Sequence, residues 1–133
     1  MKIYEYAVQT NSHTQLINID QLVQKAINES SIQDGLCVVF IPHTTAGVTI
    51  NENADPSVIS DLLKEMNKVI PFSDDYKHSE GNSAAHIKSS LVGCSCSLII
   101  ESGSAKLGTW QSVFFCEFDG PRRRKVWLKI IET

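Results

Sequence analysis

The stretch SCSLIIESGSAKLGTWQSVFFCEFDGPRRRKVWLKII, residues 95–131, decides the fold class. It contains three apolar, strand-like segments in succession, at residues 95–101, 113–118 and 125–131. Earlier in the chain, pairs of strand-like segments are separated by single helical patterns. A doubly wound sheet needs a helix after each strand, so this order predicts an α+β fold with a mixed, mostly antiparallel sheet.

The other elements follow from the spacing of apolar residues. Alternation predicts strands, and apolar residues three and four apart predict helices. The expected strands are 2–10, 15–19, 36–42 and 47–51, and two to three helices are expected, beginning near Asp20, Asp55 and Ser83. Asp20 and Asp55 are expected to cap their helices. Ala84, Ile87 and Leu91 are expected to face inward from the last helix, with Val92 as a further candidate.

Length and composition favour one domain. The chain has 133 residues, of which 42% are hydrophobic and 20% charged, as in an ordinary globular domain. A chain of this size buries roughly two-thirds of the surface of its unfolded form, so it needs no disulfide framework or structural metal to fold. Because it also has no internal repeat or linker-like run, we expect a single compact domain over residues 1–133.

The charge balance bears on partners and location. Twelve Lys and Arg stand against fifteen Asp and Glu, a net charge of −3, which argues against a general nucleic-acid binder. The longest uncharged stretch, 35–51, contains Pro42 and His43, so no membrane span is expected. The N-terminal residues lack a signal-peptide pattern, which favours a cytoplasmic location. The cysteines are expected to be small buried hydrophobic residues, namely Cys37, Cys94, Cys96 and Cys116.

Three histidines suggest a metal site. His43 follows a strand-like run, and His78 and His86 flank the turn 79–83, which lets the chain fold back between them. Three imidazoles with one open position could hold a metal that binds water or a substrate oxygen. The alternative is that His43 bonds to neighbouring threonines, while His86 is half-exposed on a helix and His78 is solvated.

Two further segments carry side chains suited to chemistry. Glu52 follows a strand and is a candidate general base. In the loop GSAKLGTWQ, Lys106 offers positive charge, and Trp110 and Gln111 could stack on and hydrogen-bond to a ring. The alternative for this loop is a glycine-bent turn with a core tryptophan.

Three consecutive arginines, 122–124, stand out in an acidic chain. Arginine presents a fork of donors that matches phosphate and carboxylate groups. Alternation along a strand would point only some of the three in one direction, and Arg122 and Arg124 are the candidates for anion binding. The alternative is a solvated strand start that faces acidic residues.

Five segments together resemble one known family. They are HTTAGVTINENADP (43–56), YKH (76–78), AAHIKSSLVG (84–93), SCSLIIESGSAKLGTWQSV (95–113) and EFDGPRRR (117–124). They are similar to the YjbQ-like family, whose members are described as secondary thiamine-phosphate synthases. The resemblance implies the family's α+β fold, a homotrimer, and a metal ion among the positions of His43, His78 and His86.

The resemblance also implies a reaction, the weak condensation of hydroxymethylpyrimidine diphosphate with thiazole phosphate. For that reaction Lys106, Arg122 and Arg124 would hold the anionic groups of the substrate, and Trp110 and Gln111 its ring. Three imidazoles favour Zn²⁺, whereas diphosphate chemistry favours Mg²⁺. Two other functions therefore compete: a zinc-dependent hydrolase of a small phosphorylated or carboxylated metabolite, with Glu52 as base, and a trimeric metabolite-binding protein without catalysis.

Overall fold

In the computed structural model, which describes residues 2–133, the chain forms eight strands and three helices. The strands are β1 (Ile3–Gln9), β2 (Gln15–Asn18), β3 (Gly35–Phe40), β4 (Ala46–Glu52), β5 (Ser95–Glu101), β6 (Ser104–Lys106), β7 (Gln111–Glu117) and β8 (Arg123–Glu132). The helices are α1 (Asp20–Ser30), α2 (Pro56–Val69) and α3 (Ser83–Val92).

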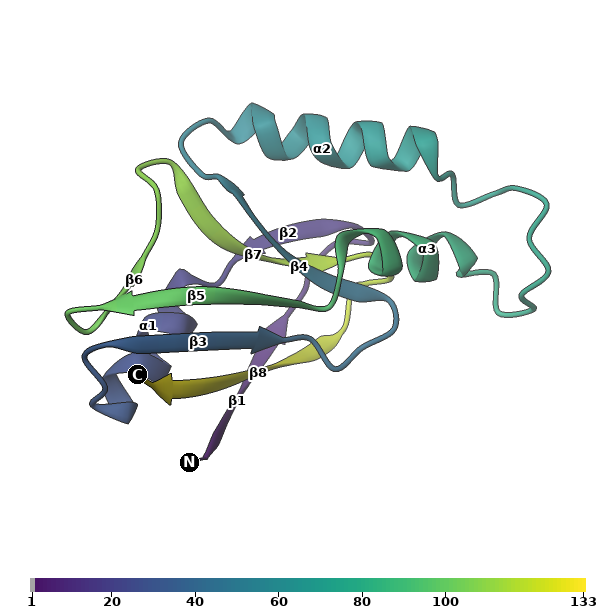
Figure 1. The fold of residues 1–133 in the computed structure, drawn as a ribbon. Coiled ribbons are helices and arrows are strands. Elements are labelled where there is room, and N and C mark those ends of the chain that lie inside the picture. Colours follow the sequence, from purple (N-terminus) through teal and green to yellow (C-terminus); the bar gives the residue numbers. More distant parts are fainter. Residues whose placement is uncertain (1) are drawn as a thin grey trace.

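The strands form two antiparallel sheets that pack on each other. One sheet has the order β1-β8-β3-β5-β6 and the other the order β2-β7-β4 (Figure 1). Residues of both sheets and of α1 meet in the main core, for example Val39, Val113, Leu128 and Ile27. The predicted α+β class with antiparallel sheets is confirmed.

Strand β7 is the centre of the smaller sheet and is buried from Ser112 to Glu117. Val113 and Phe115 belong to the main core. Cys116 belongs to a second, smaller cluster that includes Ala85 of α3. The helix α3 therefore covers the side of the smaller sheet that faces away from the larger one.

Two local predictions have different outcomes. Asp55 caps α2, because its carboxylate accepts a hydrogen bond from the Ser57 amide at 2.9 Å. The prediction that Asp20 caps α1 is wrong: Ile19 is the capping residue. Asp20 instead accepts the backbone amide of Val113 at 2.8 Å and ties α1 to β7.

The predicted inner face of α3 is confirmed for Ala84, which is 1% exposed, and is wrong for Ile87 and Leu91. Leu91 is 72% exposed and Ile87 is 38% exposed. Lys88 and Ser89 are buried instead, because other elements satisfy their polar groups: the Lys88 ammonium donates to Asn67 Oδ1, and the Ser89 hydroxyl donates to the Ala46 carbonyl at 2.6 Å. Apolar spacing alone does not detect such partners.

The cysteines only partly follow expectation. Cys37 and Cys116 are buried, and burial raises the pKa of each thiol to about 12. The expectation of burial is wrong for Cys94, which is exposed between α3 and β5. Cys96 is partly buried, and burial raises its pKa to about 11.

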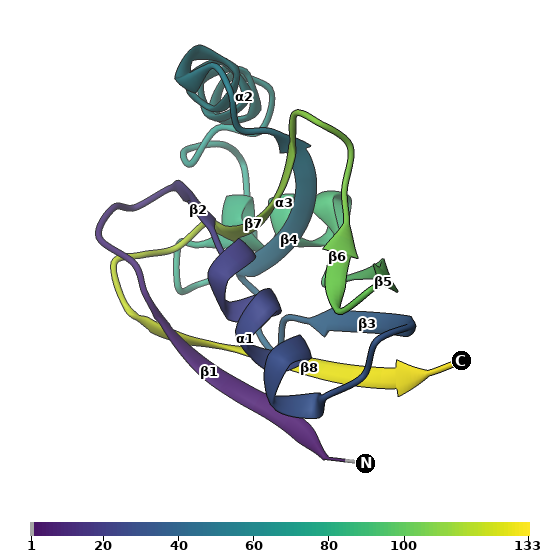
Figure 2. The same ribbon diagram turned by 90° about the vertical axis from the view of Figure 1, so that its left-hand side faces the viewer.

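The helix α2 stands away from the two sheets, as Figures 1 and 2 show. None of its residues is buried. Its apolar side and α3 line an open cavity of about 620 Å³, at which Val69 and Leu91 are about 70% exposed. Within residues 2–133, no helix combines the length and apolar character that crossing a bilayer requires.

Candidate functional site

A cavity of about 500 Å³ lies where the chain leaves β3, beside the start of β8. Residues 40–45, Cys94, Arg122 and Arg124 line it. It thus brings one predicted metal ligand, His43, together with the two arginines predicted to bind anions. We call it the His43 cavity.

Arg124 is held along one edge of its guanidinium and is 2% exposed. Its Nε donates to Glu117 Oε1 at 2.8 Å, and its Nη2 contacts Glu117 Oε2 and donates to Thr45 Oγ1 at 2.8 Å. Among the described residues Nη1 has no hydrogen-bond acceptor. Nη1 is therefore the donor of Arg124 that remains for a ligand bound in the cavity.

Glu117, fully buried on β7, balances this charge. It also accepts hydrogen bonds from Thr10 Oγ1 at 2.8 Å and from the Asp119 amide at 3.0 Å. Burial raises the pKa of Glu117, but the hydrogen bonds from Arg124, Asp119 and Thr10 outweigh it, so the pKa lies below its ordinary value. Glu117 is therefore ionised at neutral pH, and it fixes Arg124 with both carboxylate oxygens.

His43 is held as a neutral imidazole. The backbone amide of Lys125 donates to its Nε2 at 2.9 Å, which leaves the proton of the neutral ring on Nδ1. Burial lowers the pKa of His43, and the nearby charge of Arg124 lowers it further. His43 therefore offers a hydrogen-bond donor, not a second cation, and its Nε2 is already occupied.

Arg122 forms the exposed rim of the cavity. Its Nε donates to the Asp119 carbonyl at 2.9 Å, and its Nη2 donates to Asp119 Oδ2 at 3.1 Å. Asn82, just before α3, donates to the same Oδ2 at 2.9 Å. Gly120 is required in this turn, because an added Cβ would collide with the Ser12 carbonyl oxygen first and with the Glu117 side chain next. The rim is thus tied both to the buried pair and to α3.

The other two predicted metal ligands lie on a different cavity. His78 and His86 line a hollow of about 510 Å³ beside the start of α3. Their ring centroids are 5.3 Å apart and nearly perpendicular. Glu80 Oε2 lies 3.9 Å from His78 Nε2. The predicted return of the chain between these two histidines is present.

A metal fits this arrangement only in part. Two imidazoles on one tetrahedral Zn²⁺, with Zn–N bonds of about 2.1 Å, have centroids about 5 Å apart, so the spacing of His78 and His86 suits two ligand positions. Within residues 2–133, however, no group of three or more His, Cys, Asp or Glu side chains is close enough to hold an ion. One chain therefore does not assemble the predicted three-histidine centre, and His43 is the missing member.

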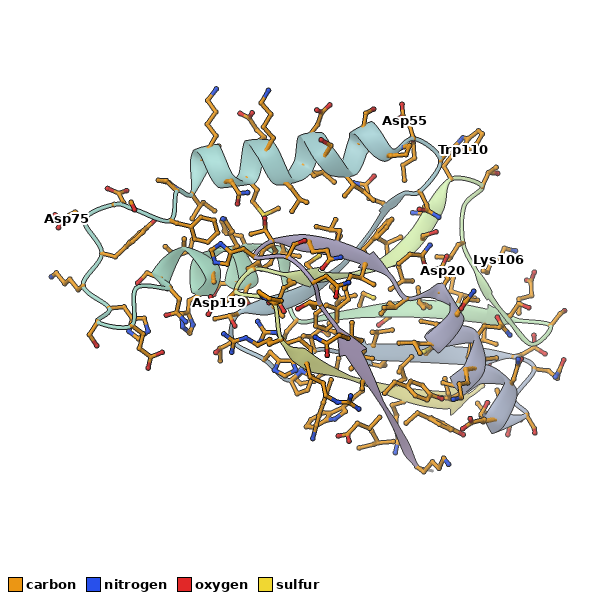
Figure 3. The ribbon with its side chains drawn as sticks, turned by 180° about the vertical axis from the view of Figure 1, so that it is seen from behind. Asp20, Asp55, Asp75, Lys106, Trp110 and Asp119 are labelled. Carbon is orange, nitrogen blue, oxygen red and sulfur yellow. The ribbon has the colours of Figure 1, made fainter. Side chains whose placement is uncertain are left out.

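The remaining predicted residues lie away from the His43 cavity. Glu52, Trp110 and Gln111 are at the opposite end of the smaller sheet, and Lys106 is on β6 of the larger sheet. Glu52 ends β4 and is paired with Gln111, and the Trp110 carbonyl accepts the Asn53 amide. At about 3.3 Å per residue, β4 places Glu52 about 20 Å from Ala46, where the His43 loop ends. Figure 3 shows Trp110 and Lys106 on one side of the molecule and Asp119 on the other. In a single chain, this group cannot act together with His43.

Comparison with known proteins places the chain in a family. The model of the family described as UPF0047 protein YjbQ-like matches residues 4–133. The chain belongs to this family. UPF0047 proteins of Methanocaldococcus jannaschii and Bacillus subtilis, the latter YugU, are 53% and 46% identical to it. The first match covers 97% of this chain and 94% of the relative, and the second covers 93% and 95%.

Two solved structures have the same fold as this chain. A crystal structure of a YjbQ/UPF0047 family protein from Clostridium acetobutylicum, 59% identical, gives a TM-score of 0.95 and covers 96% of this chain and 99% of that chain. The structure of TT1486 from Thermus thermophilus, 42% identical, gives 0.90, with the same two coverages.

Sequence reasoning missed the buried partner of the arginines. Glu117 received no role, although it is the single charge in the apolar run VFFCEF and precedes the arginine run by a short turn. An isolated acid in such a run signals a buried ion pair. The hydrogen bonds that Thr10 and Thr45 make to this ion pair had no comparable signal in the sequence. They depend on which segments fold next to β7 and β8.

Proposed function

We propose that this YjbQ-like protein binds the phosphate or carboxylate group of a small metabolite in the His43 cavity. The observation that carries the proposal is Arg124, a lining residue of the cavity that is 2% exposed, is fixed by Glu117 and Thr45 on one edge, and has no acceptor for Nη1 among the described residues. A donor held in place before the ligand arrives loses little entropy on binding. The partly desolvated surroundings also strengthen its attraction for an anion.

Two neighbours would complete the binding of the anion. His43 Nδ1–H is a neutral donor, and Arg122 adds a second positive charge at the rim. Asp119 partly neutralises Arg122, and Glu117 is saturated by its own donors. The net effect is a cavity that favours one anionic group over a cation.

The activity we propose for this site is the one implied by the family resemblance, a weak thiamine-phosphate synthase. In that condensation the thiazole nitrogen forms a bond to the pyrimidine methylene carbon, and diphosphate leaves with the electron pair of the broken C–O bond. Arg124 and Arg122 would stabilise the charge that develops on the leaving diphosphate. Glu52, Lys106, Trp110 and Gln111 do not line the His43 cavity, and they take no part in the site that we propose.

We propose that the chain also forms a homotrimer. Two separate apolar patches support this: Val69 and Leu91 at α2 and α3, and Leu36, Ile99 and Ile131, which are paired across β3, β5 and β8 on the larger sheet. A ring of three identical chains joins two different patches at every contact.

Light scattering after size exclusion tests this assembly. We expect three chains for the wild type and monomers for Leu91→Glu and for Ile99→Glu. Trp110→Glu, an exposed apolar residue outside both patches, should stay trimeric. A monomeric wild type would contradict the proposal.

A second candidate function is a metal-dependent enzyme, such as a zinc hydrolase, and the 5.3 Å spacing of His78 and His86 favours it. Its third ligand would come from another chain. Elemental analysis after incubation with Zn²⁺ should then find metal that is lost in His78→Ala and in His86→Ala. A protein that binds no zinc would remove this candidate. Zinc that is retained in His43→Ala would show that His43 is not a metal ligand and acts only in the anion cavity.

Calorimetric titration with inorganic phosphate and with diphosphate tests the anion site. Because a charge-assisted hydrogen bond contributes about 1.5–3 kcal/mol, Arg122→Gln should weaken binding about tenfold or more. Lys106→Gln, at the opposite end, is the control and should change the Kd less than twofold. No binding to the wild type, or a loss confined to Lys106→Gln, would overturn the proposal.

A turnover assay separates the enzyme from the binding protein. It would combine hydroxymethylpyrimidine diphosphate and thiazole phosphate with Mg²⁺ or Zn²⁺, and it would measure thiamine phosphate formed. Product that disappears in Arg122→Gln supports the synthase activity. Binding of diphosphate without any product would instead support a metabolite-binding protein.

A further inference from the structure

An aromatic pair borders the His43 cavity on the outer face of the larger sheet. Phe40, the last residue of β3, lines the cavity and is 40% exposed. Trp127 of β8 lies directly opposite it in the sheet and is 36% exposed. The two rings stack with centroids 6.0 Å apart and an angle of 16° between their planes.

A hydrogen bond to a neighbouring strand fixes the orientation of Trp127 in this pair. The indole Nε1–H of Trp127 donates to Glu5 Oε1 at 2.8 Å, and Glu5 is the cross-strand neighbour of Trp127 in β1. Phe40 therefore rests on a ring whose orientation is already fixed. The next residue, Ile41, is tied to the Cys94 carbonyl by a 2.7 Å hydrogen bond. The position of Phe40 relative to the cavity is thus set by its backbone and by its stacking partner.

The distance to the anion donors is short. Phe40 and His43 are three residues apart, so their Cα atoms are at most about 11 Å apart. A small ring bound on Phe40 could carry a phosphate or carboxylate that reaches His43 and Arg124. The other strongly exposed aromatic residue, Trp110, lies at the opposite end of the smaller sheet and cannot do so in one chain.

We propose that Phe40, braced by Trp127, is a specificity-determining residue of the His43 cavity, which selects ligands whose anionic group is attached to a flat aromatic ring. The inference rests on the proposed anion site, and it replaces Trp110 as the residue that holds the ring. Stacking of a flat ring on an aromatic side chain stabilises a complex enough to change affinity about tenfold.

Two phosphate monoesters that differ only in the attached group test this inference. Calorimetry would compare phenyl phosphate with methyl phosphate on the wild type, Phe40→Leu, Phe40→Tyr and Trp110→Leu. We expect the wild type to bind phenyl phosphate about tenfold more tightly than methyl phosphate. Phe40→Leu should lose this preference while binding methyl phosphate as before, Phe40→Tyr should keep it, and Trp110→Leu, the matched control, should behave as the wild type.

Three results would overturn the inference. They are a wild type without preference, a Phe40→Leu variant that keeps the preference, and a Trp110→Leu variant that loses it. Failure of the anion site is a different result, because the wild type would then bind neither ester, and the inference would fall with it. Thermal melting of Phe40→Leu confirms that any change in binding comes from a folded protein.

Discussion

The two ends of β7 use charged residues in opposite ways. At one end, Glu117 and Arg124 are buried, and every oxygen of the carboxylate has a donor. At the other end, Gln111 is exposed, and the nearby charge of Lys106 forms only an exposed ion pair with Glu101. Exposed ion pairs contribute little to stability. A buried ion pair is different, because any arrangement of the loops that separates its two charges leaves a buried charge without a partner. The comparison locates the organised site at the Glu117 end.

The largest effect that separates the two ends is expected from Glu117→Gln. Removal of the carboxylate charge leaves Arg124 buried without its counterion, which should lower the free energy of unfolding by about 3–5 kcal/mol. Urea denaturation at pH 7 measures the change. Glu52→Gln, at the opposite end, is the matched control and should change it by no more than about 0.5 kcal/mol. Equal losses of unfolding free energy in the two variants would show that the two ends of β7 do not differ in this way.

A smaller effect is expected from the titration of His43. Its pKa is lowered in the folded chain, by burial first and then by Arg124, so the unfolded chain binds more protons at this position. The stability that neutral His43 contributes is complete above about pH 6.5 and is lost as the pH falls through that range towards the folded pKa. Unfolding free energies of the wild type should therefore decrease from pH 7.5 to pH 5 more than those of His43→Gln.

This pH range lies above that in which ordinary carboxylates titrate, at about pH 4. Glu117, whose pKa is lowered, keeps its contribution throughout it. The difference between the wild type and the variant thus isolates His43. Parallel pH profiles for the two proteins would show that burial and Arg124 do not hold this ring neutral.

The smallest effect is expected at the exposed end. Lys106 and Glu101 are each 59% exposed, and their atoms lie 3.1 Å apart. Because solvent screens such a pair, Lys106→Gln should change the free energy of unfolding by less than about 0.5 kcal/mol. A urea titration in parallel with Glu117→Gln measures both. A loss above about 1 kcal/mol would mean that this end is more organised than its exposure indicates.

The sequence predicted local structure better than it predicted contacts. Strands and helices follow from spacing along the chain, which is why β3, β5 and α2 are found where the pattern places them. The three-residue strand β6 has too short a pattern to detect, and it forms because Ser102 and Gly103 turn the chain back onto β5. The inner face of α3 depends on Asn67 and Ala46, which belong to other elements.

The sequence predicted which residues are candidates for the site, but it did not predict which of them lie together. The alternation expected for the arginine run is confirmed, because Arg124 is buried between the exposed Arg123 and Lys125. Spacing could not place His43 with these arginines, since the contact arises from the antiparallel pairing of β3 with β8. The length of β4, in contrast, already implied that Glu52 and His43 are far apart.

The central claim is that an anion binds at the His43 end of the molecule. Backbone amide ¹H–¹⁵N spectra recorded during a titration with inorganic phosphate test it most directly. The account predicts that the largest shifts occur in residues 43–45, at Cys94 and in residues 122–125, with little change in residues 106–111. Largest shifts in residues 106–111, or no saturable shift at any residue, would contradict it.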